Sequence, residues 1–171
     1  MKKTPRFAPR ADASVVAPDR ESTVRTDEDL EIRVWLRLLV CVGLMEQEIR
    51  ARLRTTFGIT IARFEILAQL YRVDTGLGMK ELSDRLMVSK GNVTGLIVRM
   101  EDAGLIERRR DPVDGRAQTV SLTPKGRKLF DKVRPLHNEW FRELMHGFPR
   151  RDMKQLNDLL QGLKVSLGNR R

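Results

Sequence analysis

The sequence predicts a mainly α-helical fold that carries one small β-hairpin, and three observations support this fold class. Residues 79–103 read as two short helices joined by a tight turn, because their apolar residues recur at helical spacing. Residues 105–122 then change to the pattern of two strands around a polar turn. Long amphipathic segments precede and follow this unit, at 29–57 and 125–168. Together these features predict a winged helix-turn-helix with a small β-wing, flanked by N- and C-terminal dimerisation helices.

The N-terminal part of the chain is expected to contain a tail and then a long helix. Residues 1–27 are rich in Pro, Ala and mixed charge with little periodicity, which predicts a disordered tail ahead of one domain at 28–171. A helix is expected over 29–57, and Gly58 ends it. Its apolar stripe consists of Trp35, Leu38, Leu39, Val42, Met45, Ile49 and Leu53. Thr60 is the expected N-cap of a second helix.

The helix-turn-helix is predicted from two apolar stripes on either side of residues 87–89. The first helix carries the stripe Leu82 and Leu86. Ser89 is a good N-cap, because its hydroxyl can accept from an unpaired backbone N–H of the next turn. The second helix is expected over 90–103, with Val93, Ile97 and Met100 facing inward. Gly104 then ends it, since a left-handed residue is common after a helix.

The wing is predicted from strands at 105–109 and 117–122, joined by a polar turn at 111–116 that contains Pro, Asp and Gly. Thr123 and Pro124 open the next helix as its N-cap and its first residue. The wing therefore closes a DNA-binding lobe that we expect to occupy residues 60–123, whereas 29–57 and 125–168 are mainly dimerisation helices.

The C-terminal helices present two separate features. Pro135 lies inside the first of them, and proline lacks the N–H and clashes with the preceding turn, so we expect a kink or a break there. The last helix follows Pro149 and carries the heptad-like stripe Met153, Leu156, Leu160, Leu163 and Leu167. A second copy of the chain would cover this stripe and that of the first helix. The alternative is that both helices pack on their own domain.

Composition narrows the class of partner. The chain has 33 Lys+Arg against 23 Asp+Glu, for a net charge of +10, which attracts polyanions through counterion release. RNA, anionic lipid or an anionic metabolite would fit this charge equally well, although 5% aromatic residues argue against base-stacking RNA platforms. One Cys fits a reducing compartment. No apolar run reaches membrane-spanning length and the N-terminus lacks the apolar core of a signal peptide, so we expect a cytoplasmic protein without a membrane partner.

Each part of the helix-turn-helix also has an ordinary structural interpretation. The motif serves elsewhere as a packing unit, and exposed Lys, Asn and loop Arg residues are usually just solvated. Their order and the basic charge favour binding to double-stranded DNA. Sequence-independent coating of DNA is a rival, which would leave no palindromic footprint. Catalysis, a cofactor and a metal are not expected, because His137 and His146 are too far apart for an adjacent-turn metal pair and no Gly-rich phosphate loop appears.

Six motifs carry a resemblance to a known family. They are residues 64–67 (FEIL), 81–86 (ELSDRL), 93–96 (VTGL), 104–106 (GLI), 114–116 (DGR) and 122–126 (LTPKG). In this order they resemble the MarR family of bacterial transcriptional regulators, for which an Asp-x-Arg wing followed by Leu-Thr-Pro-x-Gly is quite specific. The resemblance implies a homodimer that binds a palindromic operator. The chain departs from the family pattern at Gly115, where many members have a second arginine, at Met87, where glycine is frequent, and at Pro135.

Three longer segments, 50–57, 63–70 and 86–96, resemble the branch of this family that regulates the breakdown of plant-derived aromatic acids. Its best-known members respond to hydroxycinnamoyl-CoA or related aryl-CoA thioesters. The resemblance therefore implies a small aromatic effector, an aryl-CoA thioester, with a free aromatic acid as the alternative.

The resemblance places the DNA contacts at the start of the second helix of the motif and in the wing. Asn and Lys can pair with the edges of adenine and guanine, and Arg can enter a narrow minor groove. The residues expected to bind DNA are Ser89, Lys90, Gly91, Asn92, Thr94, Gly95, Arg99, Arg110 and Arg116. Asp114 is expected to orient the wing by hydrogen bonding, and Arg108 and Arg109 to neutralise phosphates together with Arg110.

The resemblance also implies that the effector sits where the dimerisation helices meet the DNA-binding lobe. An aryl-CoA needs an apolar slot for its ring and cations for its phosphates. The residues expected to contact it are Arg33, Trp35, Arg37, Arg50, Arg54, Arg63 and Trp140. In this interpretation the two tryptophans wall the slot. The ordinary alternative is that the tryptophans are core residues and the arginines form a solvated face.

These expectations combine into repression that a small molecule relieves. The dimer would have DNA-competent and incompetent arrangements, and an effector that prefers the incompetent one shifts the population. Cys41 offers a redox-sensing alternative. Its apolar helical surroundings, residues 39–42, are more typical of a buried structural cysteine.

Overall fold

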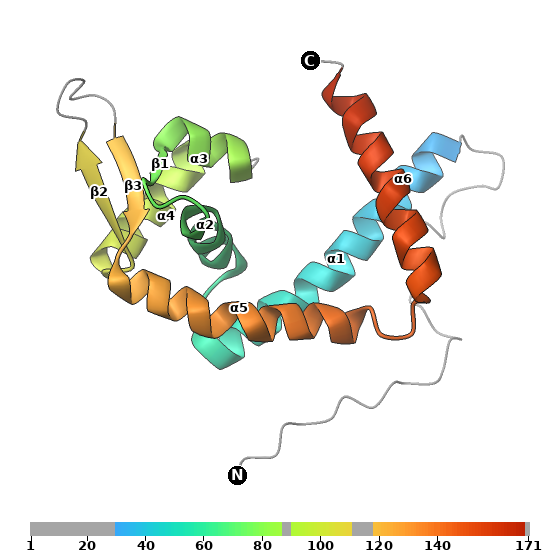
Figure 1. Cartoon of the computed structure of the whole chain (residues 1–171), viewed down its shortest axis with the longest axis horizontal. Helices are drawn as coiled ribbons and strands as arrows, with labels where there is room; N and C mark the ends of the chain where they lie inside the picture. Colours follow the sequence, from blue (N-terminus) through green and yellow to red (C-terminus); the bar gives the residue numbers. More distant parts are fainter. Residues whose placement is uncertain (1–29, 87–89, 111–117, 170–171) are drawn as a thin grey trace, which may run out of the picture. The chain divides into compact units, whose positions relative to one another are not determined.

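A computed structural model describes residues 30–86, 90–110 and 118–169 of the chain, with backbone only at 90–92 and 110. The chain divides into two compact units, residues 1–47 and 48–171, which are described separately. Six helices and three short strands follow one another in the described residues, as Figure 1 shows. The fold is mainly α with a small β-wing, in agreement with the fold class that the sequence predicts. No helix among the described residues is long and apolar enough to cross a membrane.

Helix α1, Leu30–Phe57, spans the boundary between the two units. It ends where Gly58 adopts a positive φ of 65°, a conformation that favours glycine. In the second unit, Ile49 and Leu53 of this helix are fully buried. In the first unit, Trp35, Leu39 and Val42 of the predicted stripe are exposed, and Leu38 and Met45 are partly buried. Only the last two turns of α1 therefore contribute to the core cluster.

Three helices form the helix-turn-helix lobe. Helix α2 is Ile61–Tyr71, capped by the Thr60 hydroxyl, which accepts from the backbone N–H of Arg63 at 3.3 Å. Helix α3 is Met79–Leu86 and α4 is Lys90–Asp102. The buried residues of α3 and α4 are Leu82, Ser83, Val93, Ile97 and Met100. All three inward residues predicted for α4 are thus in the core, which orients its other face away from the protein.

A three-stranded antiparallel sheet in the order β1-β3-β2 forms the wing. Its strands are β1, Leu77–Gly78; β2, Ile106–Arg110; and β3, Gln118–Leu122. The ladder pairs Ile106 with Leu122 at the root and Arg110 with Gln118 at its outer end. Strand β1, which the sequence analysis did not predict, pairs Leu77 with Val120 and closes the sheet against the lobe.

Helix α5, Pro124–Leu144, begins at the predicted Thr123 cap, whose hydroxyl accepts from the N–H of Gly126 at 3.1 Å. The helix continues through Pro135 without the break that the sequence analysis allowed. Pro135 is exposed, and it leaves the Asp131 carbonyl without its usual helical donor. Core residues on the opposite face hold the helix before and after this position, namely Phe130, Val133 and Trp140.

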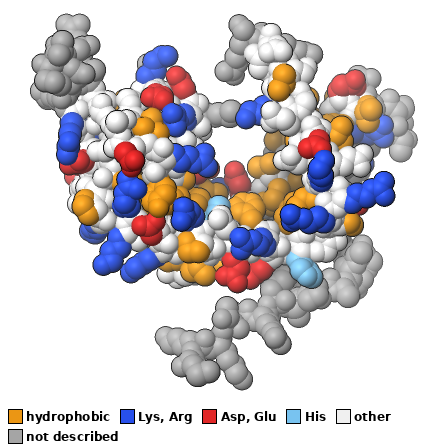
Figure 2. Space-filling view, in the orientation of Figure 1, with side chains coloured by type: hydrophobic (Ala, Val, Ile, Leu, Met, Phe, Trp, Pro, Cys, Tyr) orange, Lys and Arg blue, Asp and Glu red, His pale blue; other side chains and the backbone are white. Residues whose placement is uncertain are grey.

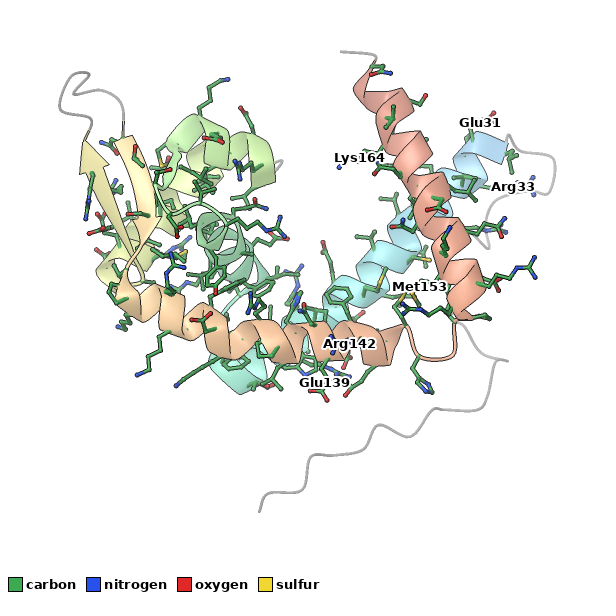
Figure 3. The ribbon with its side chains drawn as sticks, in the orientation of Figure 1. Glu31, Arg33, Glu139, Arg142, Met153 and Lys164 are labelled. Atoms are coloured by element: carbon green, nitrogen blue, oxygen red, sulfur yellow. The ribbon has the colours of Figure 1, made fainter. Side chains whose placement is uncertain are left out.

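Helix α6, Arg150–Gly168, follows Pro149 and contributes no residue to the buried core. Met153 lies in its first turns and Lys164 nearer its end (Figure 3). Its leucines Leu156, Leu159, Leu160, Leu163 and Leu167 are between 38% and 64% exposed. The predicted heptad-like stripe is therefore an uncovered apolar face within this single chain.

Candidate nucleic-acid interface

Helix α4 presents one face to the core and the opposite face to solvent. Thr94, Gly95 and Arg99, three of the residues predicted to bind DNA, are exposed on the outer face. A Cβ atom built on Gly95 would meet only the Arg99 guanidinium, at 4.0 Å. The backbone of α4 is therefore accessible at Gly95, as close approach to another molecule requires.

Several of the predicted DNA contacts lie outside the described residues. Ser89 belongs to 87–89, and Asp114 and Arg116 belong to 111–117. Lys90, Gly91, Asn92 and Arg110 are described by their backbone, which places the first three in the first turn of α4 and Arg110 at the outer end of β2. The roles of these residues remain predictions.

Two arginines of β2, Arg108 and Arg109, already have carboxylate partners. The Nε of Arg108 donates to Glu101 of α4 at 2.6 Å, and the guanidinium of Arg109 donates to Glu107 of its own strand at 2.8 Å. The hydrogen bond from Arg108 lowers the pKa of the Glu101 carboxyl and, in return, raises the pKa of Arg108. The expected phosphate-neutralising charge of these arginines is therefore balanced inside the unbound protein.

The junction between α4, the wing and α5 is tightly packed. Gly104, with a φ of 68°, reverses the chain after α4, and its carbonyl accepts from the Thr123 hydroxyl at 2.7 Å. The ammonium group of Lys125 donates to the carbonyl of Ala103 at 2.7 Å. Gly126 packs so closely that a Cβ atom on it would lie 1.9 Å from the Leu105 carbonyl oxygen. These contacts fix the position of the wing relative to α5. They also give Thr123, Lys125 and Gly126 of the LTPKG motif a structural role.

The surface of the molecule carries many cations. In the view of Figure 2, Lys and Arg side chains outnumber Asp and Glu. The first half of α5 carries five cations, Lys125, Arg127, Lys128, Lys132 and Arg134. Arg127 and Arg134 stack on the Tyr71 ring, at 5.1 and 5.3 Å from its centroid, and Arg127 also donates to Asp74 at 3.0 Å. These two arginines thus hold α5 against α2 in addition to contributing charge.

The residues predicted to contact the effector fall into both units. Arg33, Trp35 and Arg37 belong to the first unit, in which Trp35 is 60% exposed and Arg33 is partly buried (Figure 3 labels Arg33 near the start of α1). In the second unit, Arg50 and Arg54 are exposed and Arg63 is partly buried.

Trp140 is only 9% exposed, so it is a core residue rather than a wall of an open slot. Its ring packs 6.3 Å from that of Phe57. The guanidinium of Arg52 lies 6.0 Å from the centroid of the Trp140 ring. This guanidinium also donates to Glu48 at 2.7 Å and to Glu143 at 2.6 Å, which ties α1 to α5. The sequence signals the pairing of Glu48 with Arg52 through its four-residue spacing, but not the contact with Glu143.

A ladder of aromatic rings between α2 and α5 was also missed by sequence reasoning. Phe64 stacks on His137 with ring centroids 4.1 Å apart, and His137 meets Phe141 at 4.9 Å. At the other end Tyr71 packs on Phe130 at 4.6 Å. Burial lowers the pKa of His137, because the charged imidazolium would lose solvation here. The seven-residue spacing of Phe64 and Tyr71, matched by Phe130 and His137, is the signal that could have revealed the ladder.

Cys41 is exposed, so the prediction that it is a buried structural cysteine is wrong for the single chain. The apolar neighbours Leu39 and Val42 are exposed too, because this stretch of α1 lies outside the core cluster. No group of three or more His, Cys, Asp or Glu residues in the described part of the chain could hold a metal ion.

Helix-turn-helix, wing and exposed recognition face together define a winged helix-turn-helix protein, and comparison with known proteins identifies its family. A sequence model described as MarR family matches residues 57–117. A MarR family regulator from Silicibacter pomeroyi, whose structure is known, is 30% identical to this chain, with a TM-score of 0.71. The match covers 80% of this chain and 94% of the Silicibacter chain. This chain belongs to the MarR family of DNA-binding transcriptional regulators.

Two further relatives extend the comparison. AbsC from Streptomyces coelicolor, a MarR family regulator, is 27% identical with a TM-score of 0.74, and the match covers 85% of this chain and 99% of AbsC. BadR from Rhodopseudomonas palustris, named a transcriptional activatory protein, is 29% identical over 141 residues, which are 81% of this chain and 79% of BadR. Both matches extend well beyond the helix-turn-helix.

A more distant structure is CouR from Rhodococcus jostii, bound to p-coumaroyl-CoA. It is 19% identical to this chain, with a TM-score of 0.67, and the match covers 80% of this chain and 94% of the CouR chain. At this identity the likeness establishes the shared fold alone.

Proposed function

We propose that this chain is a homodimeric repressor that binds a palindromic operator and is released from it by a small aromatic effector, an aryl-CoA thioester. The observation that carries the proposal is the outer face of α4, where Thr94, Gly95 and Arg99 are exposed beside a wing in a MarR family chain. The proposal has three parts, which concern DNA reading, dimerisation and the effector.

DNA reading is assigned to α4 and the wing. The first turn of α4, with Lys90 and Asn92, would meet base edges in the major groove, where Lys pairs with guanine and Asn with adenine. The exposed Gly95 would let the helix lie close to the duplex. Arg99 would contact a phosphate, and Arg116 at the wing tip would enter the minor groove. Because phosphate contacts carry no sequence information, specificity rests on the first turn of α4 and on the wing.

Dimerisation is supported by the apolar face of α6. An exposed leucine stripe of this length on a single chain is typical of an interface. A second copy carries the same stripe, so a two-fold pairing would cover both at once. It would also present two α4 helices to successive major grooves, about 34–36 Å apart.

The effector class is supported by the CouR complex, whose ligand is an aryl-CoA thioester. Cations suited to the phosphates of such a ligand occur on both units, at Arg33 and Arg37 and at Arg50, Arg54 and Arg63. Because Trp140 is buried, Trp35 is the better candidate of the two tryptophans for contact with the aromatic ring. A free aromatic acid is the alternative, and it would need fewer cations.

Release would follow from a population shift. An effector that prefers the arrangement with wrongly spaced α4 helices lowers the affinity for the operator. By linkage, operator DNA must then weaken effector binding by the same factor. Titration calorimetry measures the affinity for p-coumaroyl-CoA in the presence and in the absence of a selected operator. Equal affinity with and without operator rules out this mechanism. Release by p-coumarate as efficiently as by its thioester favours the free-acid alternative.

The Arg99 phosphate contact gives a direct test of the interface. Replacing Arg99 with Ala is expected to weaken binding to all duplexes to a similar extent and to lower the slope of log K against log salt concentration by about one. Fluorescence anisotropy between 50 and 200 mM salt measures this slope. The matched control is R151A, which removes an exposed arginine from α6, outside the DNA-binding lobe. An unchanged slope in R99A, or an equal change in R151A, contradicts the assignment.

Transcriptional activation is a second candidate, because BadR is named an activatory protein. In-vitro transcription from a promoter that carries the selected operator separates the two modes, since a repressor lowers and an activator raises transcript yield. Redox sensing through the exposed Cys41 is tested in the same assay. It is supported only if peroxide abolishes the effect on transcription and C41S prevents this loss.

A further inference from the structure

One ion pair crosses from the recognition helix to the wing. The Nε of Arg108 in β2 donates to Oε2 of Glu101 in α4 at 2.6 Å, and a second guanidinium nitrogen of Arg108 contacts the same oxygen. The two side chains are 32% and 33% exposed, so the pair is partly shielded from water. It therefore connects the two elements to which the proposed function assigns the reading of DNA.

The local sequence dictates where this pair forms. The chain reverses directly after α4, because Gly104 takes a positive φ and the N–H of Leu105 donates to the Met100 carbonyl at 2.9 Å. Strand β2 therefore contacts α4. Ile106 is buried, and Arg108, two residues further, lies on the same face of the strand. Glu101, in the last turn of α4, lies where it can accept from Arg108.

The pair extends the contact between α4 and β2 beyond the apolar core. At the root, Ile106 is buried and pairs with Leu122 across the sheet. Arg108 pairs with Val120, two ladder steps nearer the wing tip. Strand β1 supports the other edge of β3 at Val120 and Thr119, whereas β2 is an edge strand of the described sheet. The angle of β2 to α4 therefore depends on the contacts that β2 itself makes with this helix beyond the root. The Glu101–Arg108 pair supplies such a contact.

We propose that Glu101 and Arg108 are positioning residues that set the wing against the recognition helix and thereby determine sequence specificity. This inference rests on the proposed reading of DNA by α4 and the wing. Neither side chain needs to touch DNA. Their role is to hold strand β2 at the position relative to α4 at which α4 and the wing meet their grooves together. Random duplexes, which are bound through phosphates alone, do not require this alignment.

The chain provides a matched control on the other face of the same strand. Glu107 accepts from Arg109 at 2.8 Å and from the Ser121 hydroxyl at 3.2 Å. Both partners lie in the wing, on β2 and β3, so this network does not reach α4. Replacing Glu107 with Gln removes one carboxylate and weakens one arginine pair, as the same change at Glu101 does, but it leaves the link to α4 intact.

The experiment compares the E101Q and E107Q variants with the wild-type protein, all as full-length chains. Fluorescence anisotropy measures the affinity of each for a duplex selected from a random library by the wild-type protein, and for a scrambled duplex of equal length. E101Q is expected to lower the ratio of specific to non-specific affinity by about tenfold, within the range of one lost base contact. E107Q is expected to change both affinities by the same factor, because it alters only the charge near DNA. Thermal melts of each variant show whether the fold is retained.

A charge exchange, Glu101→Arg with Arg108→Glu, provides the second variant. It restores an ion pair between α4 and β2 and is expected to recover most of the specificity ratio that E101Q loses. If E101Q acted only through the loss of its charge, the exchange would not restore this ratio. If the wild-type protein shows no preference for any duplex, the proposed function fails and the inference fails with it. If the wild-type protein discriminates and E101Q discriminates equally well, only the positioning role is overturned. A ratio that stays low in the charge-exchanged variant also overturns it.

Discussion

Gly126 is the position at which the packing between α5 and the wing is most sensitive to a single added atom. It lies in the first turn of α5 and is buried. A Cβ atom there would lie 1.9 Å from the Leu105 carbonyl oxygen, 2.9 Å from the Leu105 carbonyl carbon and 3.3 Å from a methyl group of Leu122. Two of these atoms are backbone and cannot rotate away. Replacing Gly126 with Ala must therefore move α5 away from the loop between α4 and β2.

The magnitude of this change follows from opposing contributions. Separating the new Cβ from Leu105 requires a movement of more than about 1 Å, and overpacking of this kind costs about 1–3 kcal/mol. The movement also strains the hydrogen bonds from Thr123 to the carbonyls of Gly104 and Leu105, each of which contributes about 1 kcal/mol. The higher helix propensity of alanine offsets about 1 kcal/mol of this destabilisation. We expect G126A to lower the free energy of unfolding by about 2–3 kcal/mol, which corresponds to a fall in Tm of about 4–12 °C for a chain of this length.

Thermal unfolding followed by circular dichroism measures the effect. Protein concentration must be equal in all samples, since association of the chains raises Tm. The control is G162A in α6, where a Cβ would meet nothing within 4 Å and only the propensity term applies, so Tm is expected to stay equal or rise. If G126A melts at the wild-type temperature, the close contact between α5 and Leu105 does not exist as described.

Three further predictions address the other parts of the account. Replacing Leu163 with Asp should convert a dimer to a monomer in light scattering, because a charge would enter the apolar face of α6; V165D, on the opposite side of that helix, should remain dimeric. G95A should keep or raise Tm, since its Cβ meets only Arg99 at 4.0 Å, yet weaken operator binding severalfold by holding α4 away from the duplex. Because burial lowers the pKa of His137, its neutral form stabilises the fold above the ordinary histidine pKa of about 6.5, and this stabilisation is lost as pH falls through the lowered value. Between pH 8 and 5, H137Q should therefore show a flatter dependence of Tm on pH; an equal slope contradicts the burial of His137.

The sequence predicted the helix-turn-helix and the β2–β3 hairpin because these elements are encoded by local patterns. Val93, Ile97 and Met100 recur at helical spacing, and all three are buried. The Thr123 cap was likewise predictable, since a threonine followed by proline is a local signal for a helix start. Strand β1 is only two residues long and is defined by its pairing with β3, so no local sequence pattern predicts it.

Contacts between segments that are distant in the sequence could not be predicted from local patterns. Arg52 and Glu143 are 91 residues apart and meet only because α1 and α5 pack together. The burial of Trp140 follows from the same packing, and it fits the alternative in which this tryptophan is a core residue. A kink or a break was expected at Pro135, and the break did not form, because tertiary contacts on the opposite face of α5 outweigh one missing hydrogen bond. The exposure of Cys41 could not be predicted either, since an apolar stripe does not reveal whether its own chain or a second copy covers it.

Selection of duplexes from a random library by the full-length protein, followed by sequencing, tests the central claim most directly. A dimer that places two α4 helices in successive major grooves should enrich an inverted repeat whose half-sites are centred about 10 base pairs apart. Enrichment of single half-sites without symmetry, or of no sequence at all, would contradict the account of a paired reader.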